Sequence, residues 1–104
     1  MRGDVHRLRA PRGVRGNEQS GSRYAVILQA DDLPLSTVLV APTSRSAPER
    51  SFRPTVHIDG AATQVLVEQT TAIALERLGE RVGNLTWTEL ARVNSALRLA
   101  LELD

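Results

Sequence analysis

Few side chains in this chain could do chemistry, and two of them, Arg23 and Thr43, stand out by position. The 104 residues contain no cysteine, which excludes a thiol nucleophile, and the two histidines, His6 and His57, have no matching ligand partners for a metal. No Gly-rich nucleotide fingerprint and no nucleophile elbow occurs. Arg23 and Thr43 each lie where a long polar stretch meets an apolar one, so a strand could hold the side chain while the adjoining loop admits a ligand. Position alone predicts no more than a small β domain with a basic face.

The charged residues are divided unevenly between the two halves of the chain. The formal net charge is +1, but residues 1–53 carry nine arginines against five acidic residues, and residues 54–104 carry four against seven. All 13 basic residues are arginine, which either reflects genomic base composition or favours bidentate contacts with phosphate. The basic first half indicates an anionic partner. Three aromatic residues are too few to stack successive bases of single-stranded nucleic acid, so such a partner would be bound through charge and hydrogen bonds.

Length and composition place the chain among small folded domains. With 104 residues, 41% of them hydrophobic and 24% charged, we expect one domain over residues 1–104. The apolar runs are far shorter than the roughly 20 residues of a membrane-spanning helix, and no apolar stretch follows the N-terminus as in a signal peptide. We therefore expect no membrane span and a location in the reducing cytoplasm, in keeping with the absence of cysteine.

Three strands are expected in the first half. Residues 2–8 alternate between apolar and polar side chains, as a half-buried strand does. Residues 24–28 form a continuous apolar run typical of a central strand, and residues 37–41 predict a second buried strand that ends at Pro42. Long polar loops are predicted at residues 10–22 and 43–54, and the first is long enough to act as a mobile flap.

The second half is expected to complete the sheet and to end in a helix. Residues 55–58 alternate before the turn Asp59-Gly60, residues 64–67 predict another strand, and residues 72–75 and 81–82 are either strands or turns. The helix is predicted over residues 87–102 from the capping box Thr86-x-x-Glu89, the staple Leu85 with Leu90, and the apolar face Leu90, Val93, Leu97 and Leu101. The predicted fold class is mainly β (α+β), a small bent sheet or barrel with a C-terminal helix packed on it.

Four pieces of the sequence resemble the MazF/PemK/Kid-type toxins of toxin–antitoxin systems. The family opens with Arg-Gly-Asp-Val, followed by Glu-Gln-x-Gly-x-Arg-Pro before an apolar strand. The matching pieces are Arg2-Gly3-Asp4-Val5, residues 17–29, residues 37–44, and Val65-Leu66-Val67-Glu68-Gln69 followed by Glu76-Arg77-Leu78. They occur in the family's order, and the similarity reaches the final helix.

The resemblance implies an SH3-like β-barrel with a C-terminal helix, assembled as a homodimer and inhibited by a cognate antitoxin. It also implies metal-independent, cofactor-free, sequence-specific cleavage of single-stranded RNA. Attack by the ribose 2′-OH would give 2′,3′-cyclic phosphate and 5′-hydroxyl ends, so DNA is not an expected substrate. The family's catalytic arginine and threonine match Arg23 and Thr43. Its RNA-binding positions match Glu18, Gln19, Ser44, Arg45 and Gln69.

The chain departs from the family pattern at three positions. Tyr24 replaces the usual proline and could add a stacking ring, and Thr71 stands where many relatives have arginine. His57 is displaced by one residue from a histidine of some relatives, and because such a shift reverses the face of a strand, we assign it no catalytic role.

Two other functions remain open at this point. CcdB-type toxins share the barrel but bind DNA gyrase without nuclease activity. They typically end in Trp-Gly-Ile, whereas this chain ends Leu101-Glu102-Leu103-Asp104, and they lack the arginine and threonine pair. A non-enzymatic SH3-like interaction module is the other alternative.

Overall fold

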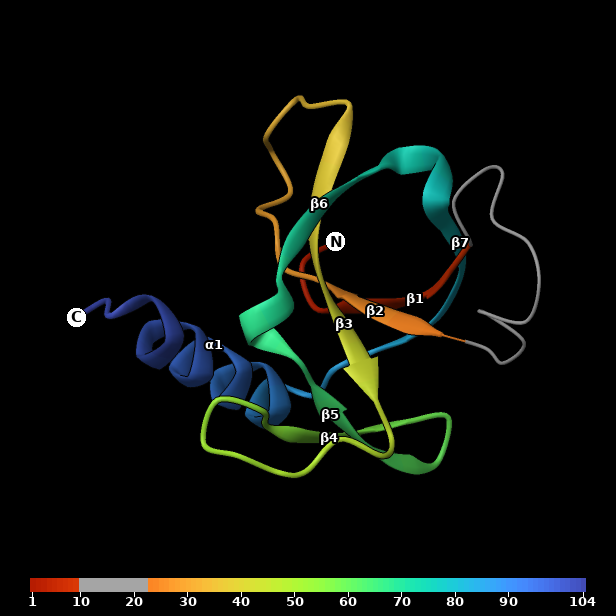
Figure 1. The fold of residues 1–104 in the computed structure, drawn as a ribbon. Helices are drawn as coiled ribbons and strands as arrows, with labels where there is room; N and C mark the ends of the chain where they lie inside the picture. The colour runs from red at the N-terminus through yellow and green to blue at the C-terminus, as the bar shows by residue number, and fades with distance from the viewer. Residues whose placement is uncertain (10–22) are drawn as a thin grey trace.

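The computed structural model describes residues 1–9 and 23–104, so the loop predicted at residues 10–22 lies outside the described residues. In the described part, strands are followed by one C-terminal helix (Figure 1). The elements are, in chain order, β1 (Asp4–Leu8), β2 (Tyr24–Ile27), β3 (Thr37–Ser44), β4 (Thr55–Ile58), β5 (Ala61–Val65), the 3₁₀ turn η1 (Val67–Gln69), β6 (Thr71–Ala74), the 3₁₀ turn η2 (Leu75–Arg77), β7 (Leu78–Asn84) and α1 (Trp87–Leu101). The predicted fold class is confirmed.

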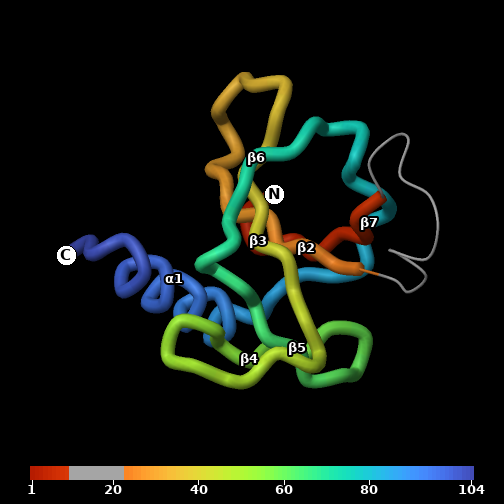
Figure 2. Tube along the Cα trace, viewed as in Figure 1, coloured from red at the N-terminus to blue at the C-terminus, as the bar shows by residue number. Residues whose placement is uncertain are grey.

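The strands form one antiparallel sheet in the order β4-β5-β3-β2-β1-β7, and β6 also pairs with β3. β3 has two partners along one edge, because Thr37–Val40 pairs with β6 whereas Thr43 and Ser44 pair with β5. The sheet curls strongly, and Figures 1 and 2 show the strands bending round into a half-barrel. The predicted Asp59-Gly60 turn joins β4 to β5, with both residues at positive φ, which is the geometry of a tight hairpin.

β2 is buried on both faces because its alternating side chains enter two different clusters. Tyr24 and Val26 pack with the β4–β5 hairpin and with Val93 of α1. Ala25 and Ile27 face the other way, into a second cluster. The remaining buried members of that cluster are Val38, Val40 and Ile73. Burial on both faces explains why the strand is a continuous apolar run rather than an alternating one.

The prediction that Pro42 ends the third strand is wrong. β3 continues through Pro42 to Ser44, with Pro42 opposite Ala25 of β2. A proline removes a backbone donor but keeps its carbonyl, and the Pro42 carbonyl accepts a bond of 2.9 Å from Leu66 N. Pro42 also lies where β3 passes from its β6 partner to its β5 partner, a position that tolerates the missing donor. Thr43 is therefore a strand residue, and the following loop covers residues 45–54.

The strands of the second half differ from their predicted bounds. The strand expected at residues 64–67 is β5, which ends at Val65, and the chain then enters η1. The two segments left open as strands or turns are confirmed as strands, and β7 is longer than residues 81–82. β7 contains two glycines and alternates poorly, and it forms because β1 offers it an unpaired edge.

The helix begins where the capping box predicts. The Thr86 side chain accepts from Glu89 N, and Glu89 accepts in return from Thr86 N. Val93 and Ala96 are buried against the sheet, but Leu101, placed on the buried face from the sequence, is 62% exposed. The last turns of α1 extend past the strands (Figure 1), so the apolar face of the helix is longer than the part of the sheet that it packs against.

Candidate functional site

Pairing of β2 with β3 brings Arg23 and Thr43 to the same end of the sheet. Ala25 lies opposite Pro42, and the Thr43 hydroxyl donates to the Tyr24 carbonyl at 2.9 Å, so the residues before Ala25 run beside the residues after Pro42. The Arg23 carbonyl accepts a bond of 2.9 Å from Leu8 N, which extends the β1–β2 ladder to the residue before β2. The backbones of Arg23, Thr43 and Ser44 are thus neighbours although about 20 residues of chain separate the first from the other two.

Thr43 is held in the strand rather than presented by a loop. It is 7% exposed, and its Oγ1 donates to the Tyr24 carbonyl at 2.9 Å. A hydroxyl has one proton and two lone pairs, so this bond uses its donor and leaves it able to accept. Thr43 can donate to another oxygen only by exchanging the Tyr24 carbonyl for it.

Arg23 and Tyr24 are adjacent in sequence but have opposite environments. Arg23 is exposed at the entrance of β2, as its position in the sequence predicts. Tyr24 is buried in the cluster beneath the helix, and the Arg7 guanidinium lies 5.3 Å from the centre of its ring. The suggestion that Tyr24 adds a ring for stacking bases is therefore wrong, because the ring belongs to the core.

Ser44 is the last residue of β3 and Arg45 is the first residue of the following loop, and the two side chains differ in their contacts. Ser44 Oγ lies 3.2 Å from Ser46 N and 3.0 Å from Ala47 N, and both amides donate to it. Its side chain therefore orders the start of the loop, as serine does in such turns. Arg45 is exposed. Of the other predicted RNA-binding residues, Glu18 and Gln19 lie outside the described residues.

Gln69 lies beside β3 on the edge that pairs with β5 and β6, between Val65 and Thr71. Leu66 N donates to the Pro42 carbonyl, which places the chain entering η1 beside the end of β3, and Gln69 is the exposed last residue of that turn. The preceding residue, Glu68, accepts from Arg53 Nη2 and Nε at 2.8 and 2.9 Å. Hydrogen bonding to Arg53 lowers the pKa of Glu68 below its ordinary value. Nothing in the sequence signals this pair, because the two residues are 15 positions apart on different elements.

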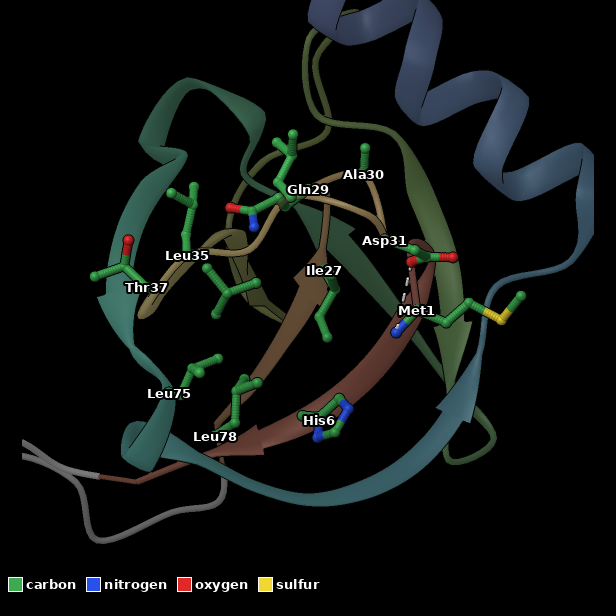
Figure 3. Close-up of a pocket in the computed structure, with 12 residues that line it drawn as sticks. Met1, His6, Ile27, Gln29, Ala30, Asp31, Leu35, Thr37, Leu75 and Leu78 are labelled. Atoms are coloured by element: carbon green, nitrogen blue, oxygen red, sulfur yellow. Dashed lines mark ion pairs between the residues drawn. The ribbon is translucent and has the colours of Figure 1, made fainter.

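A cavity of about 310 Å³ lies at the opposite end of β3 (Figure 3). Aliphatic side chains from β2, β3, β7 and the loop before β3 surround it, together with His6 and Gln29. His6 Nδ1 lies 3.0 Å from the Gly79 carbonyl, and Gln29 Oε1 accepts from Leu39 N at 3.1 Å. None of the predicted site residues that the structure describes lines this cavity.

Two further observations concern metals and membranes. Across residues 1–9 and 23–104, no three His, Cys, Asp or Glu side chains come together as a metal site would require. In the same residues, α1 is too short and too polar to cross a bilayer.

Comparison with known proteins identifies the class. The model of the PemK-like, MazF-like toxins of type II toxin–antitoxin systems matches residues 1–101. The chain therefore belongs to this family, and it is a toxin of a toxin–antitoxin system of the MazF/PemK type.

Individual relatives agree with this assignment. The chain is 38% identical over 104 residues to the Mycobacterium tuberculosis (strain ATCC 25618 / H37Rv) protein named Putative toxin Rv3098A/RVBD_3098A, covering 99% of this chain and 98% of the relative. The fold of the present chain matches that of the Mycobacterium tuberculosis toxin MazF-mt6 with a TM-score of 0.78 at 20% identity. The match covers 97% of this chain and 98% of the toxin. The fold also matches a mycobacterial endoribonuclease solved in complex with its cognate antitoxin, with a TM-score of 0.79 at 17% identity, covering 100% and 96%.

Proposed function

We propose that this toxin is a metal-independent endoribonuclease that cleaves single-stranded RNA at a short sequence motif. The observation that carries the proposal is that pairing of β2 with β3 brings Arg23 and Thr43 to the same end of the sheet, in a chain of the MazF/PemK family. The basic first half of the chain supports an anionic substrate.

In the proposed reaction, the ribose 2′-OH attacks the adjacent phosphorus and the 5′-oxygen leaves. The 2′-oxygen loses its proton, the departing oxygen gains one, and the products are a 2′,3′-cyclic phosphate and a 5′-hydroxyl end. Arg23 contacts the scissile phosphate and stabilises the charge that grows on it in the pentavalent state. A guanidinium has a pKa above about 12, so Arg23 acts through its charge rather than as a base. Thr43 donates to a nonbridging oxygen when RNA replaces the Tyr24 carbonyl as the acceptor of its proton.

RNA recognition is assigned to residues around this pair. Glu18, Gln19, Ser44, Arg45 and Gln69 would contact the strand and read the Watson–Crick edges of unstacked bases. DNA lacks the attacking 2′-OH and is not cleaved. Arg45 is exposed and can approach a phosphate directly. The Ser44 hydroxyl oxygen already accepts a hydrogen bond from the Ser46 amide, and its proton is the group that it can offer to RNA.

The proposed assembly is a cytoplasmic homodimer neutralised by a cognate antitoxin. The structural neighbour described as an endoribonuclease in complex with its cognate antitoxin supports such a partner. An antitoxin segment rich in acidic residues would suit the basic first half, and its binding should weaken as salt is added.

The test is direct. Purified, antitoxin-free protein is incubated with a mixture of RNAs in EDTA, and the cut sites are mapped by primer extension. We expect EDTA-resistant cleavage at a recurrent short motif, with 2′,3′-cyclic phosphate ends, and no cleavage where the nucleotide on the 5′ side of the cut carries a 2′-deoxyribose. Intact RNA after incubation with a demonstrably folded sample would refute the proposal.

A further inference from the structure

The loop of residues 45–54 has a defined conformation built from hydrogen bonds within itself and to β5. Its start is ordered by the Ser44 hydroxyl, which accepts from the amides of Ser46 and Ala47. Its end is ordered by Thr55, whose Oγ1 donates to Glu49 Oε2 at 3.0 Å and lies 2.9 Å from the side-chain amide of Gln64. The loop is long and polar in sequence, yet it is tied down at both ends.

Arg53 connects this loop to η1. Its Nη2 and Nε both donate to Glu68 Oε2, and its guanidinium lies 5.4 Å from the centre of the Phe52 ring, which packs on the core cluster beneath the helix. The two charged side chains are 22% and 28% exposed, so water screens the pair less than it screens a fully exposed one. A charge-assisted contact with two donors is also stronger and more directional than a single neutral hydrogen bond.

The three arginines of the loop are therefore not equivalent. Arg45 and Arg50 are exposed, and Arg50 Nη1 donates to the carbonyl of the neighbouring Glu49 at 2.8 Å. Arg53 is partly buried, and its guanidinium is engaged by a carboxylate and a ring. An arginine already paired with a carboxylate is a poor phosphate ligand, because RNA would have to displace the carboxylate.

We propose that Arg53 and Glu68 form a positioning clamp that holds the 45–54 loop against η1 and so sets the spacing between Arg45 and Gln69. Arg45 lies at the start of the clamped loop, and Gln69 directly follows Glu68 in the chain. The clamp keeps these two RNA-contacting residues in one arrangement before RNA arrives, which lowers the ordering cost of binding. This inference rests on the proposed function, since the spacing matters only if RNA binds there.

The competing role for Arg53 is direct contact with an RNA phosphate, and the two roles predict opposite signs for one substitution. Glu68→Gln removes a negative charge next to Arg53. If Arg53 contacts phosphate, Glu68→Gln frees it and lowers KM. If the pair is a clamp, Glu68→Gln loosens the loop and raises KM by about tenfold, the cost of losing one charge-assisted contact, with kcat little changed.

The matched control is Glu80→Gln. Glu80 pairs with Arg7 at 3.2 Å between β1 and β7, outside the 45–54 loop and η1, and its loss removes the same charge from the protein. We expect KM for Glu80→Gln within about twofold of the wild type, since an exposed ion pair contributes little. In the reversed pair, Arg53→Glu with Glu68→Arg, KM should be lower than in either of these substitutions alone, because the ion pair is re-formed. If Arg53 instead contacts phosphate, the reversed pair would not lower KM in this way.

A second measurement does not depend on RNA. Amide hydrogen exchange of Ser46, Ala47 and Arg53 should accelerate in Arg53→Gln and in Glu68→Gln and stay unchanged in Glu80→Gln, because these amides are bonded within the loop. Unchanged exchange in the two clamp variants would show that the pair does not hold the loop, and would overturn the inference.

The two measurements together separate the possible failures. Faster exchange with unchanged KM and unchanged cut sites would overturn the positioning role while leaving the ribonuclease proposal intact. If the wild type leaves RNA intact, the proposed function and the role of the clamp in RNA binding fail together, and the exchange experiment still decides whether the ion pair orders the loop. A lower KM for Glu68→Gln would assign Arg53 to phosphate instead.

Discussion

The two ends of β3 present different surfaces, although one continuous strand connects them. At the Ser44 end lie Arg23 and the loop of residues 45–54, with polar side chains joined by hydrogen bonds. At the Thr37 end lies the cavity of about 310 Å³, walled mainly by aliphatic side chains. A pocket is the usual first hypothesis for a binding site, but the groups proposed to stabilise a phosphate are at the other end of β3. None of the described residues that line this cavity belongs to the proposed site.

Arg23→Ala should have the largest effect. We expect cleavage to fall by about 10³-fold or more, because an arginine that stabilises charge developing on a phosphoryl group contributes on that scale. The measurement is kcat on a short RNA that contains the mapped cut site. Arg92→Ala, which removes an exposed arginine from α1, serves as the control and should keep wild-type activity. Equal activity of the two variants would remove Arg23 from the reaction.

A pair of threonine substitutions compares the two ends of β3 directly. Thr43→Val removes the hydroxyl but keeps the β-branched shape, and kcat should fall by about 10²–10³-fold, the usual cost of one donor to a developing oxyanion. Thr37→Val makes the same chemical change at the cavity end and should leave kcat unchanged. Thermal unfolding of both variants separates a catalytic loss from loss of the Thr43 bond to the Tyr24 carbonyl. If Thr37→Val slowed cleavage as much as Thr43→Val, the two ends would not differ in function.

Gln29→Leu should lower the stability of the protein without changing its catalytic rate. Gln29 is 9% exposed, and its Oε1 accepts from Leu39 N. Leucine leaves that amide without its partner, so the free energy of unfolding should fall by about 1–3 kcal/mol, measured by urea denaturation. The kcat of the folded fraction should match the wild type. A selective loss of kcat at unchanged stability would move the reactive site to the cavity end.

Glu89→Gln should have the smallest effect, and it depends on pH. Burial alone would raise the pKa of Glu89, but bonds donated by the backbone amides of Thr86 and His57 outweigh it and hold the pKa below its ordinary value. The carboxylate therefore contributes stability that is complete above the unfolded pKa, about 4.3, and is lost as the pH falls through the lower folded value.

We accordingly expect Glu89→Gln to lower the free energy of unfolding by about 1 kcal/mol at pH 7. Below about pH 4, the free energies of unfolding of the variant and the wild type should approach each other, because the wild-type carboxylate becomes protonated. The control is Glu102→Gln at the exposed C-terminal cap of the same helix. At pH 7 its free energy of unfolding should stay within about 0.5 kcal/mol of the wild type, as for other surface substitutions. A constant difference between Glu89→Gln and the wild type across the acid range would contradict the assigned role of the charge.

The sequence predicts the structure correctly where contacts between neighbouring residues decide it. The capping box predicts the start of α1 because Thr86 and Glu89 satisfy each other's backbone amides within one turn. The Asp59-Gly60 turn is predicted because few other dipeptides adopt two consecutive positive φ angles. Neither result depends on distant parts of the chain.

The errors arose where a distant partner decides the outcome. Pro42 looks like a strand end, yet Leu66 and Ala25 keep it in the ladder. Leu101 follows the apolar spacing of the helix, yet its side chain is 62% exposed in the described part of the chain. Tyr24 looks accessible next to a polar loop, yet the alternation of β2 turns its ring into the core.

The sequence by itself predicts most of the strands, the helix and the family, because strand runs, turn dipeptides, a capping box and short motifs all depend on neighbouring residues. It also named Arg23 and Thr43. Only the tertiary structure decided that Thr43 is buried with its proton committed, and that Arg53 meets Glu68. Those contacts join residues far apart in the chain, and their formation depends on strand register and curvature, which no single segment encodes.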